Sequence, residues 1–145
     1  MPTHHIPQGL HSVTPYLIVK DAARLLEFVR RAFDAQELFC SRRNDGTIAH
    51  ALVKIGDAAI ECAEAQPEWP ATTTACHLYV SDADATYERA LGAGATSLYP
   101  PADRFYGDRE SGVKDPCGNA WFIATHREDV PPDELARRAA AALKA

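Results

Sequence analysis

Two histidines and one glutamate are the residues best suited to chemistry in this chain of 145 residues. His50 and Glu61 lie in short apolar runs, and His77 lies in a third such run, residues 75–80. An imidazole and a carboxylate can exchange protons with a ligand when their surroundings tune their pKa values. Glu61 is therefore a candidate general base, and His77 and His50 are candidate acid–base partners or ligand donors. The alternative for Glu61 is a polar network with a histidine or Arg109 that only completes the interior.

Aromatic residues accompany these groups on the predicted strands. Strand alternation directs one set of side chains toward covering helices and the other set toward the opposite face. We expect the helix-facing set to contain Val13, Leu17, Val19, Cys76, Leu78 and Val80, with Trp121 also in the core. The opposite face then receives four aromatic rings that can stack on a flat ligand or simply pack together. These rings are Tyr16, Tyr79, Tyr106 and Phe122.

Arg109 is a further candidate for ligand binding. Its planar guanidinium can hold an anionic group through two parallel hydrogen bonds. The alternative is a structural ion pair with Asp108, Glu110 or Asp115. The neighbouring glycines, Gly107 and Gly112, predict an irregular strand that such a pair would hold in place.

The elements that position these residues follow a pattern that occurs twice. The stretch Thr14–Asp21 resembles Ala75–Asp82, 61 positions later: Val19 matches Val80, Asp21 matches Asp82, and Tyr16 matches His77. Each stretch reads as a strand that runs into a helix capped by aspartate. Apolar spacing predicts helices over 22–33 and 83–91, with strands over 13–19, 35–41, 47–55, 58–63, 75–80, 95–98, 105–114 and 120–125 and a loop over 99–103.

These elements predict an α+β fold made of two βαβββ modules. The modules span 12–65 and 75–126, residues 66–74 link them, and a helix over 131–143 ends a single domain covering 1–145. Two such modules form a half-open barrel, or cup, with the helices outside.

Composition excludes several other functions. The net charge is −5 without a basic stripe, which argues against nucleic acid as a partner. No apolar run approaches the ~20 residues of a membrane helix, and residues 1–9 lack the features of a signal peptide, so we expect a cytoplasmic protein. The spacing of the four cysteines fits no zinc or redox motif, which favours reduced, buried thiols.

The doubled order resembles the vicinal oxygen chelate superfamily, which includes glyoxalase I, bleomycin-resistance proteins, fosfomycin-resistance enzymes and extradiol dioxygenases. Its PhnB-like branch is the closer match. Short phrases carry the resemblance over roughly residues 12–135. They are residues 13–19, His50 with 55–57, 77–80, 100–101 followed by 105–109, 115–119 with Trp121, and 123–126 with 128–130.

The resemblance implies one divalent ion at the centre of the cup in the metal-dependent members. Its four ligand positions correspond here to Thr14, Glu61, Ala75 and Phe122, of which only Glu61 is a competent ligand. We therefore expect no metal cofactor. An alternative set, His50, Glu61 and His77, would suit Zn, Fe(II) or Mn.

Two functions remain open at this point. The first is a protein that binds a small aromatic or amphipathic molecule in the cup without a metal, as the bleomycin-resistance members do. The second is a metal-dependent isomerase, lyase or dioxygenase that uses His50, Glu61 and His77. The resemblance also implies a homodimer, because members of this superfamily often complete the cup with strands from a partner.

Overall fold

The computed structural model describes residues 3–144 and contains the two predicted modules in succession. Both have the order strand, helix and three strands, which confirms the predicted fold class. The first module comprises β1 (Tyr16–Val19), α1 (Ala22–Phe33), β2 (Gln36–Arg42), β3 (Ile48–Ile55) and β4 (Ala58–Glu64). The second comprises β5 (Ala75–Tyr79), α2 (Ala83–Gly92), β6 (Thr96–Asp103), β7 (Asp108–Lys114) and β8 (Ala120–His126), and α3 (Pro132–Leu143) follows it.

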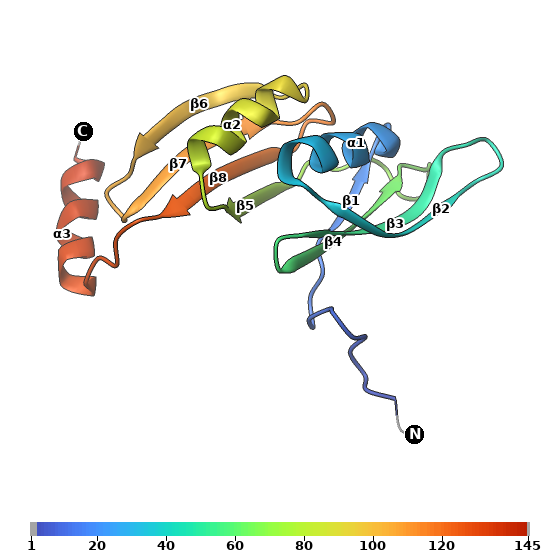
Figure 1. The fold of residues 1–145 in the computed structure, drawn as a ribbon, viewed down its shortest axis with the longest axis horizontal. Coiled ribbons are helices and arrows are strands. Elements are labelled where there is room, and N and C mark those ends of the chain that lie inside the picture. The colour runs from blue at the N-terminus through green and yellow to red at the C-terminus, as the bar shows by residue number, and fades with distance from the viewer. Residues whose placement is uncertain (1–2, 145) are drawn as a thin grey trace.

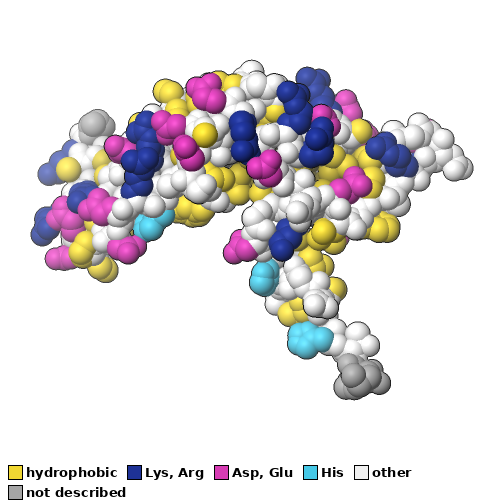
Figure 2. Space-filling view, viewed as in Figure 1, with side chains coloured by type: hydrophobic (Ala, Val, Ile, Leu, Met, Phe, Trp, Pro, Cys, Tyr) yellow, Lys and Arg dark blue, Asp and Glu magenta, His cyan; other side chains and the backbone are white. Residues whose placement is uncertain are grey.

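Each module forms its own four-stranded sheet. The strand orders are β1-β4-β3-β2 and β5-β8-β7-β6, and only the first pair in each sheet is parallel. The registers repeat as well: Tyr16 pairs with Glu61, and His77 pairs with Phe122, each 61 positions later. Figure 1 shows α1 and α2 side by side on the same side of the two sheets. The opposite sides of the sheets are therefore left uncovered by helices, and Figure 2 shows this underside hollowed.

The core lies between the sheets and the two helices. Leu17 and Val19 of β1 are buried there, as is Trp121 of β8, which confirms the expected orientation of these strands. Val13 was expected beside them, but 83% of it is exposed. The chain joins the sheet only at Tyr16, so strand alternation does not extend back to Val13. All four cysteines are free thiols.

The two helices are joined at their C-terminal ends. Arg89 of α2 donates through Nη2 to the carbonyl of Ala32 at 2.6 Å, and Arg31 of α1 donates to the carbonyl of Gly92 at 3.1 Å. The last carbonyls of a helix have no partner within the helix. Each arginine therefore satisfies a free carbonyl of the other module's helix. The N-terminal ends carry the predicted aspartate caps, Asp21 and Asp82.

The second module departs from the sequence prediction at β6 and β7. Residues 99–103 were expected to form a loop, but β6 continues through them and includes Pro100 and Pro101. β6 is the outer strand of its sheet, where the missing proline N–H is tolerated. Shifts in the register between β6 and β7 accommodate the extra length. β7 begins at Asp108 rather than Phe105, because the chain turns at Gly107.

The turn between β7 and β8 is built around Asp115, which is 4% exposed. Its Oδ1 accepts hydrogen bonds from the backbone N–H groups of Cys117 (2.8 Å) and Asn119 (3.0 Å). Its Oδ2 accepts from Trp121 Nε1 at 2.8 Å and from Asn119 Nδ2 at 3.1 Å. The Asn119 side chain in turn accepts from Thr74 N at 2.9 Å, so this turn also holds the end of the linker.

The turn at Gly107 fixes the segment that leads to α3. The Gly107 carbonyl accepts from Arg127 N at 2.9 Å and from Glu128 N at 3.1 Å. Arg138 of α3 then donates to the Phe105 carbonyl and pairs with Glu128. α3 itself has no buried residue and stands at the outer end of the second module (Figure 1). Within residues 3–144, no helix is both long and apolar enough to cross a membrane.

Candidate functional site

The uncovered face of the first sheet carries a histidine–glutamate pair among aromatic rings. His50 Nε2 lies 2.8 Å from Glu61 Oε1. The His50 ring also lies beside the rings of Tyr16 and Phe39, with centroids 5.8 and 5.7 Å away. His50 reaches this face because its neighbour Ala51 points into the core. The structure therefore brings together three of the residues predicted for this site: Tyr16, His50 and Glu61.

A cavity of about 540 Å³ opens beside this pair. Its apolar surface comes from Tyr16, Ile18 and small alanines, and Trp69 of the linker forms part of its rim. Trp69 is held in place by a pair of backbone hydrogen bonds with Gln66, both 2.9 Å. The volume is in the range of cavities that hold small organic ligands. The full lining is Tyr16, Ile18, Arg43, Ala49, Ala63, Glu64, Gln66 and Trp69.

The same face of the second sheet carries a second histidine–glutamate pair. His77 Nε2 lies 2.9 Å from Glu110 Oε1, and the Tyr99 hydroxyl donates to Glu110 Oε2 at 2.7 Å. His77 and Glu110 lie on β5 and β7, with β8 between them. The pair can form across β8 because the residue opposite Glu110 is the small Ala124.

Asp108 extends this polar cluster toward the end of β7. The Tyr79 hydroxyl donates to Asp108 Oδ2 at 2.9 Å, and His126 Nδ1 lies 2.8 Å from Asp108 Oδ1. Asp108 is 4% exposed and Glu110 7%, whereas His77, Tyr79 and His126 are exposed. Two buried carboxylates thus lie beneath a layer of imidazole and phenol groups.

The surroundings of Glu110 favour its ionised form. Burial alone would raise the pKa of this carboxyl, but hydrogen bonds from Tyr99, His77 and Tyr106 outweigh burial, and the pKa lies below its usual value. The same contacts raise the pKa values of the Tyr99 and Tyr106 phenols. Burial first, and then the Glu110 hydrogen bond, raise the pKa of Tyr106 to about 12. Tyr106 therefore supports a buried carboxylate in this structure.

Gly112 allows Tyr99 to reach Glu110. A Cβ atom at this position would lie 2.7 Å from a carbon of the Tyr99 ring, so only glycine leaves room for the ring on the strand. The ring also stacks on Phe122, with centroids 6.4 Å apart. In the first module the equivalent pair is Phe39 and Leu52. There the aromatic ring carries no hydroxyl and the larger side chain replaces glycine.

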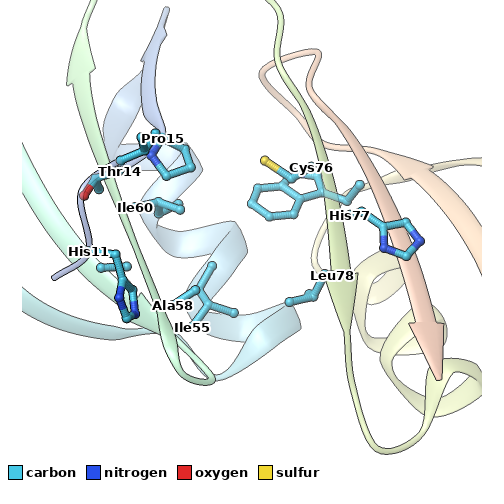
Figure 3. A pocket seen from close by; sticks show the side chains of 12 residues that line it. His11, Thr14, Pro15, Ile55, Ala58, Ile60, Cys76, His77 and Leu78 are labelled. Carbon is cyan, nitrogen blue, oxygen red and sulfur yellow. The ribbon is translucent and has the colours of Figure 1, made fainter. Parts of the chain in front are cut away.

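A smaller pocket of about 190 Å³ lies between the two modules and is lined by residues of both. Figure 3 shows Cys76 and Leu78 pointing from β5 toward the first module, while His77 points away from this gap. Thr14 and Pro15 line the other side. The alternation along β5 thus places His77 on the uncovered face, as predicted.

Arg109 does not lie on that face. It alternates with Asp108 and Glu110 along β7 and therefore points toward α2, where it pairs with Asp84 at 2.6 Å and with Asp103 at 3.3 Å. The structure supports neither contact with a ligand in the cup nor the predicted pairing with the nearest acids. An ion pair does hold Arg109, but its partners come from α2 and β6.

Several residues of these sites were missed from sequence, among them Arg43, Trp69, Asp108 and Glu110. Trp69 was assigned to a linker, and the two acids were considered only as partners for Arg109. The alternation of Asp108 and Glu110 two positions apart on one strand was the available signal. Nothing in the local sequence around Arg43 indicates that its side chain borders a cavity.

The family description "Glyoxalase/Bleomycin resistance protein/Dioxygenase superfamily" matches residues 9–123, most of the chain. The chain belongs to this superfamily. Its two βαβββ modules are thus the two halves of the fold that the sequence resemblance implied.

Similar proteins align with most of the chain. An uncharacterised protein of Mycobacterium bovis is 33% identical over 135 residues, which cover 86% of this chain and 89% of that protein. The crystal structure of TioX from Micromonospora is 25% identical, with a TM-score of 0.69 over 80% of this chain and 98% of TioX. A PhnB protein from Bacillus cereus is 14% identical, with a TM-score of 0.59 over 79% and 99% of the two chains, a likeness that shows the fold alone.

The residues at the superfamily's expected metal positions do not fit a metal ion. Thr14 and Ala75 stand at the first-strand positions, and Glu61 and Phe122 at the last-strand positions. Glu61 alone could ligate, and its Oε1 is already paired with His50. A catalytic metal needs about three protein ligands. These four positions therefore lack the ligands that a catalytic ion would need.

The alternative set of His50, Glu61 and His77 is divided between the two sheets. His50 and Glu61 form one pair on the first sheet, whereas His77 bonds to Glu110 on the second. Among residues 3–144, the one group of three potential metal ligands is His77, Asp108 and Glu110, whose ligand atoms lie within 4.8 Å of one another. The physical reason is that His77 belongs to β5, whose sheet includes β7 but not β3 or β4.

Proposed function

We propose that this protein binds a small aromatic molecule on the uncovered face of its first module. The observation that carries the proposal is the cavity of about 540 Å³ whose lining includes Tyr16 and Trp69. Trp69 is 66% exposed although it is large and apolar, and two hydrogen bonds with Gln66 fix its backbone beside the cavity. An exposed ring beside an apolar cavity favours stacking on a flat ligand.

The neutral fluorescent probe N-phenyl-1-naphthylamine tests this function. We expect the wild-type protein to bind the probe with an increase in its fluorescence. Trp69→Ala is expected to weaken binding by about tenfold, because the stacked ring and its buried area are lost. Leu143→Ala is the matched control, since it removes an exposed apolar side chain on α3, a helix that contributes no residue to the cavity lining.

Two outcomes would contradict the proposal. One is the absence of probe binding by the folded wild-type protein. The other is an equal effect of Trp69→Ala and Leu143→Ala on the affinity. Circular dichroism of each variant establishes that the fold is retained.

A second candidate function is a metal-dependent enzyme, and the cluster of His77, Asp108 and Glu110 favours it. One imidazole and two carboxylates suit a divalent ion such as Zn²⁺ or Mn²⁺. The outer contacts of Tyr99 and His126 would orient the two carboxylates, as groups around metal ligands commonly do. A bound ion would supply Lewis-acid polarisation of oxygen atoms on a substrate.

Calorimetric titration with Zn²⁺ or Mn²⁺ alone tests the second candidate. We expect Glu110→Gln to weaken binding by about tenfold or more, because a ligand charge is lost, and Glu61→Gln to leave the affinity unchanged. The protein carrying His4→Ala and His5→Ala serves as the background, since these neighbouring tail histidines can bind metal themselves. Loss of binding in Glu61→Gln but not in Glu110→Gln would overturn the assignment of ligands.

A further inference from the structure

The cavity of the first module has one cationic side chain in its lining, Arg43. Arg43 follows the end of β2 and is partly buried. Its Nη1 donates to the Ile48 carbonyl at 3.2 Å, and this contact fixes the direction of the side chain. A guanidinium has five N–H donors, so most of them remain available.

No carboxylate in residues 3–144 lies within ion-pair distance of Arg43. Every ion pair that the structure contains there involves another arginine or a histidine. An arginine beside an apolar cavity normally gains from a carboxylate or similar anion, because the charge-assisted bonds are stronger than neutral ones. Arg43 acts on Asp45 only from beyond ion-pair distance, and Asp45 is bonded to Thr47, so the lining contains a positive charge without an ion-pair partner.

Glu64, which lines the cavity, and Glu61, which pairs in register with Tyr16, are already engaged. Glu64 accepts from Asp21 N at 2.7 Å and from Ala22 N at 3.0 Å, which places its charge at the N-terminal end of α1. Glu61 is paired with His50. Both carboxylates therefore have partners other than Arg43.

The charge of Arg43 reaches the aromatic part of the cavity. Burial raises the pKa of the Tyr16 phenol, as does the charge of Glu61, and Arg43 acts against both. Arg43 and Tyr16 are thus close enough to interact electrostatically while lining one cavity. A ring stacked at Tyr16 would bring an acidic substituent within reach of the guanidinium.

We propose that the ligand of the first-module cavity is a flat aromatic anion, with its ring between Tyr16 and Trp69 and its acidic group on Arg43. This inference rests on the proposed binding function and adds the charge of the ligand to it. The guanidinium fork selects a carboxylate or sulfonate over an uncharged substituent, because only the anion accepts two charge-assisted hydrogen bonds.

Two probes with the same aromatic frame separate the charge from the rings. 1-Anilinonaphthalene-8-sulfonate carries one sulfonate, and N-phenyl-1-naphthylamine lacks it. We expect the wild-type protein to bind the sulfonate about tenfold more tightly than the neutral probe, which corresponds to one charge-assisted contact. Raising the salt concentration from about 0.05 M to about 0.5 M is expected to weaken only the sulfonate, since salt screens its attraction to Arg43.

Arg43→Gln and Arg42→Gln form a matched pair of variants. Both remove one positive charge at the end of β2, but Arg42 donates to the Gly46 carbonyl and does not line the cavity. We expect Arg43→Gln to abolish the preference for the sulfonate while leaving the neutral probe bound, and Arg42→Gln to retain the preference. Arg43→Lys keeps the charge but loses the planar fork, so an intermediate preference is expected.

The outcomes distinguish this inference from the function on which it rests. If both probes bind equally and Arg43→Gln changes neither affinity, the ligand is not selected by charge and the inference fails, while the binding function stands. An equal loss in Arg42→Gln and Arg43→Gln would also overturn it, because the effect would then come from overall charge. If neither probe binds, the binding function itself fails.

Discussion

Replacing Asp115 by alanine is expected to lower the free energy of unfolding by about 3–4 kcal/mol, because several buried donors lose their acceptor together. The Trp121 indole N–H, the Asn119 side-chain amide and two backbone N–H groups all donate to this carboxylate. Urea denaturation followed by circular dichroism measures the change. In a Trp69→Phe background, Trp121 fluorescence reports on the same turn, since this indole is buried and bonded to Asp115.

Asp45→Ala is the control for this prediction. Asp45 makes an outwardly similar turn, in which its Oδ1 accepts from Thr47 N at 3.0 Å and from the Thr47 hydroxyl at 2.7 Å. That turn is exposed, so water replaces the lost acceptor and little change in stability is expected. Equal stability of the two variants would show that the buried network around Asp115 contributes nothing beyond an ordinary turn.

Replacing Gly107 by alanine is the second change with a large expected effect, a loss of about 2–3 kcal/mol from backbone strain and a clash with main-chain atoms. Gly107 has φ +97°, and a Cβ atom there would lie 2.2 Å from the Glu128 carbonyl oxygen. That carbonyl belongs to the segment leading to α3, so this segment must shift. Denaturation measures the loss, and hydrogen exchange at Arg127 and Glu128, whose N–H groups bond to Gly107, is expected to become faster.

Gly46→Ala separates strain from steric clash. Gly46 has φ +89°, close to that of Gly107, but no atom lies within 4 Å of a Cβ built at this position. Only the conformational cost remains, about 1 kcal/mol. A cost for Gly107→Ala no greater than that for Gly46→Ala would show that the segment after β8 moves away freely.

The sequence was sufficient to predict the modules because both carry the same local information. Asp21 and Asp82 cap helices in both copies, and the apolar residues before them continue into buried strands. The prediction was wrong where tertiary context outweighs local preference. Pro100 and Pro101 indicate a loop, yet they occupy a strand because β6 lies at the edge of its sheet.

The candidate site was less predictable, because it depends on which side chains meet across strands. His77 and Glu110 are 33 residues apart and lie on strands separated by β8. Their contact requires the register set by the Asp115 turn and the small Ala124 between them. Pairing between His50 and Glu61 involves adjacent strands, and its members could be placed on one face from alternation alone. The position of Trp69 depends on a linker with no periodicity.

The repeated register has a consequence for how the two uncovered faces differ. Equivalent backbone positions hold Phe39 and Tyr99 on β2 and β6, and Tyr16 and His77 on β1 and β5. Both faces carry aromatic rings and a histidine–glutamate pair, but the first has a cation at its edge and the second contains two buried acids, although the strands pair alike. The side chains that pack against the helices are mainly apolar in both modules, so their burial stabilises both modules in the same way. One polypeptide thus presents two faces of unlike chemistry on a single duplicated scaffold.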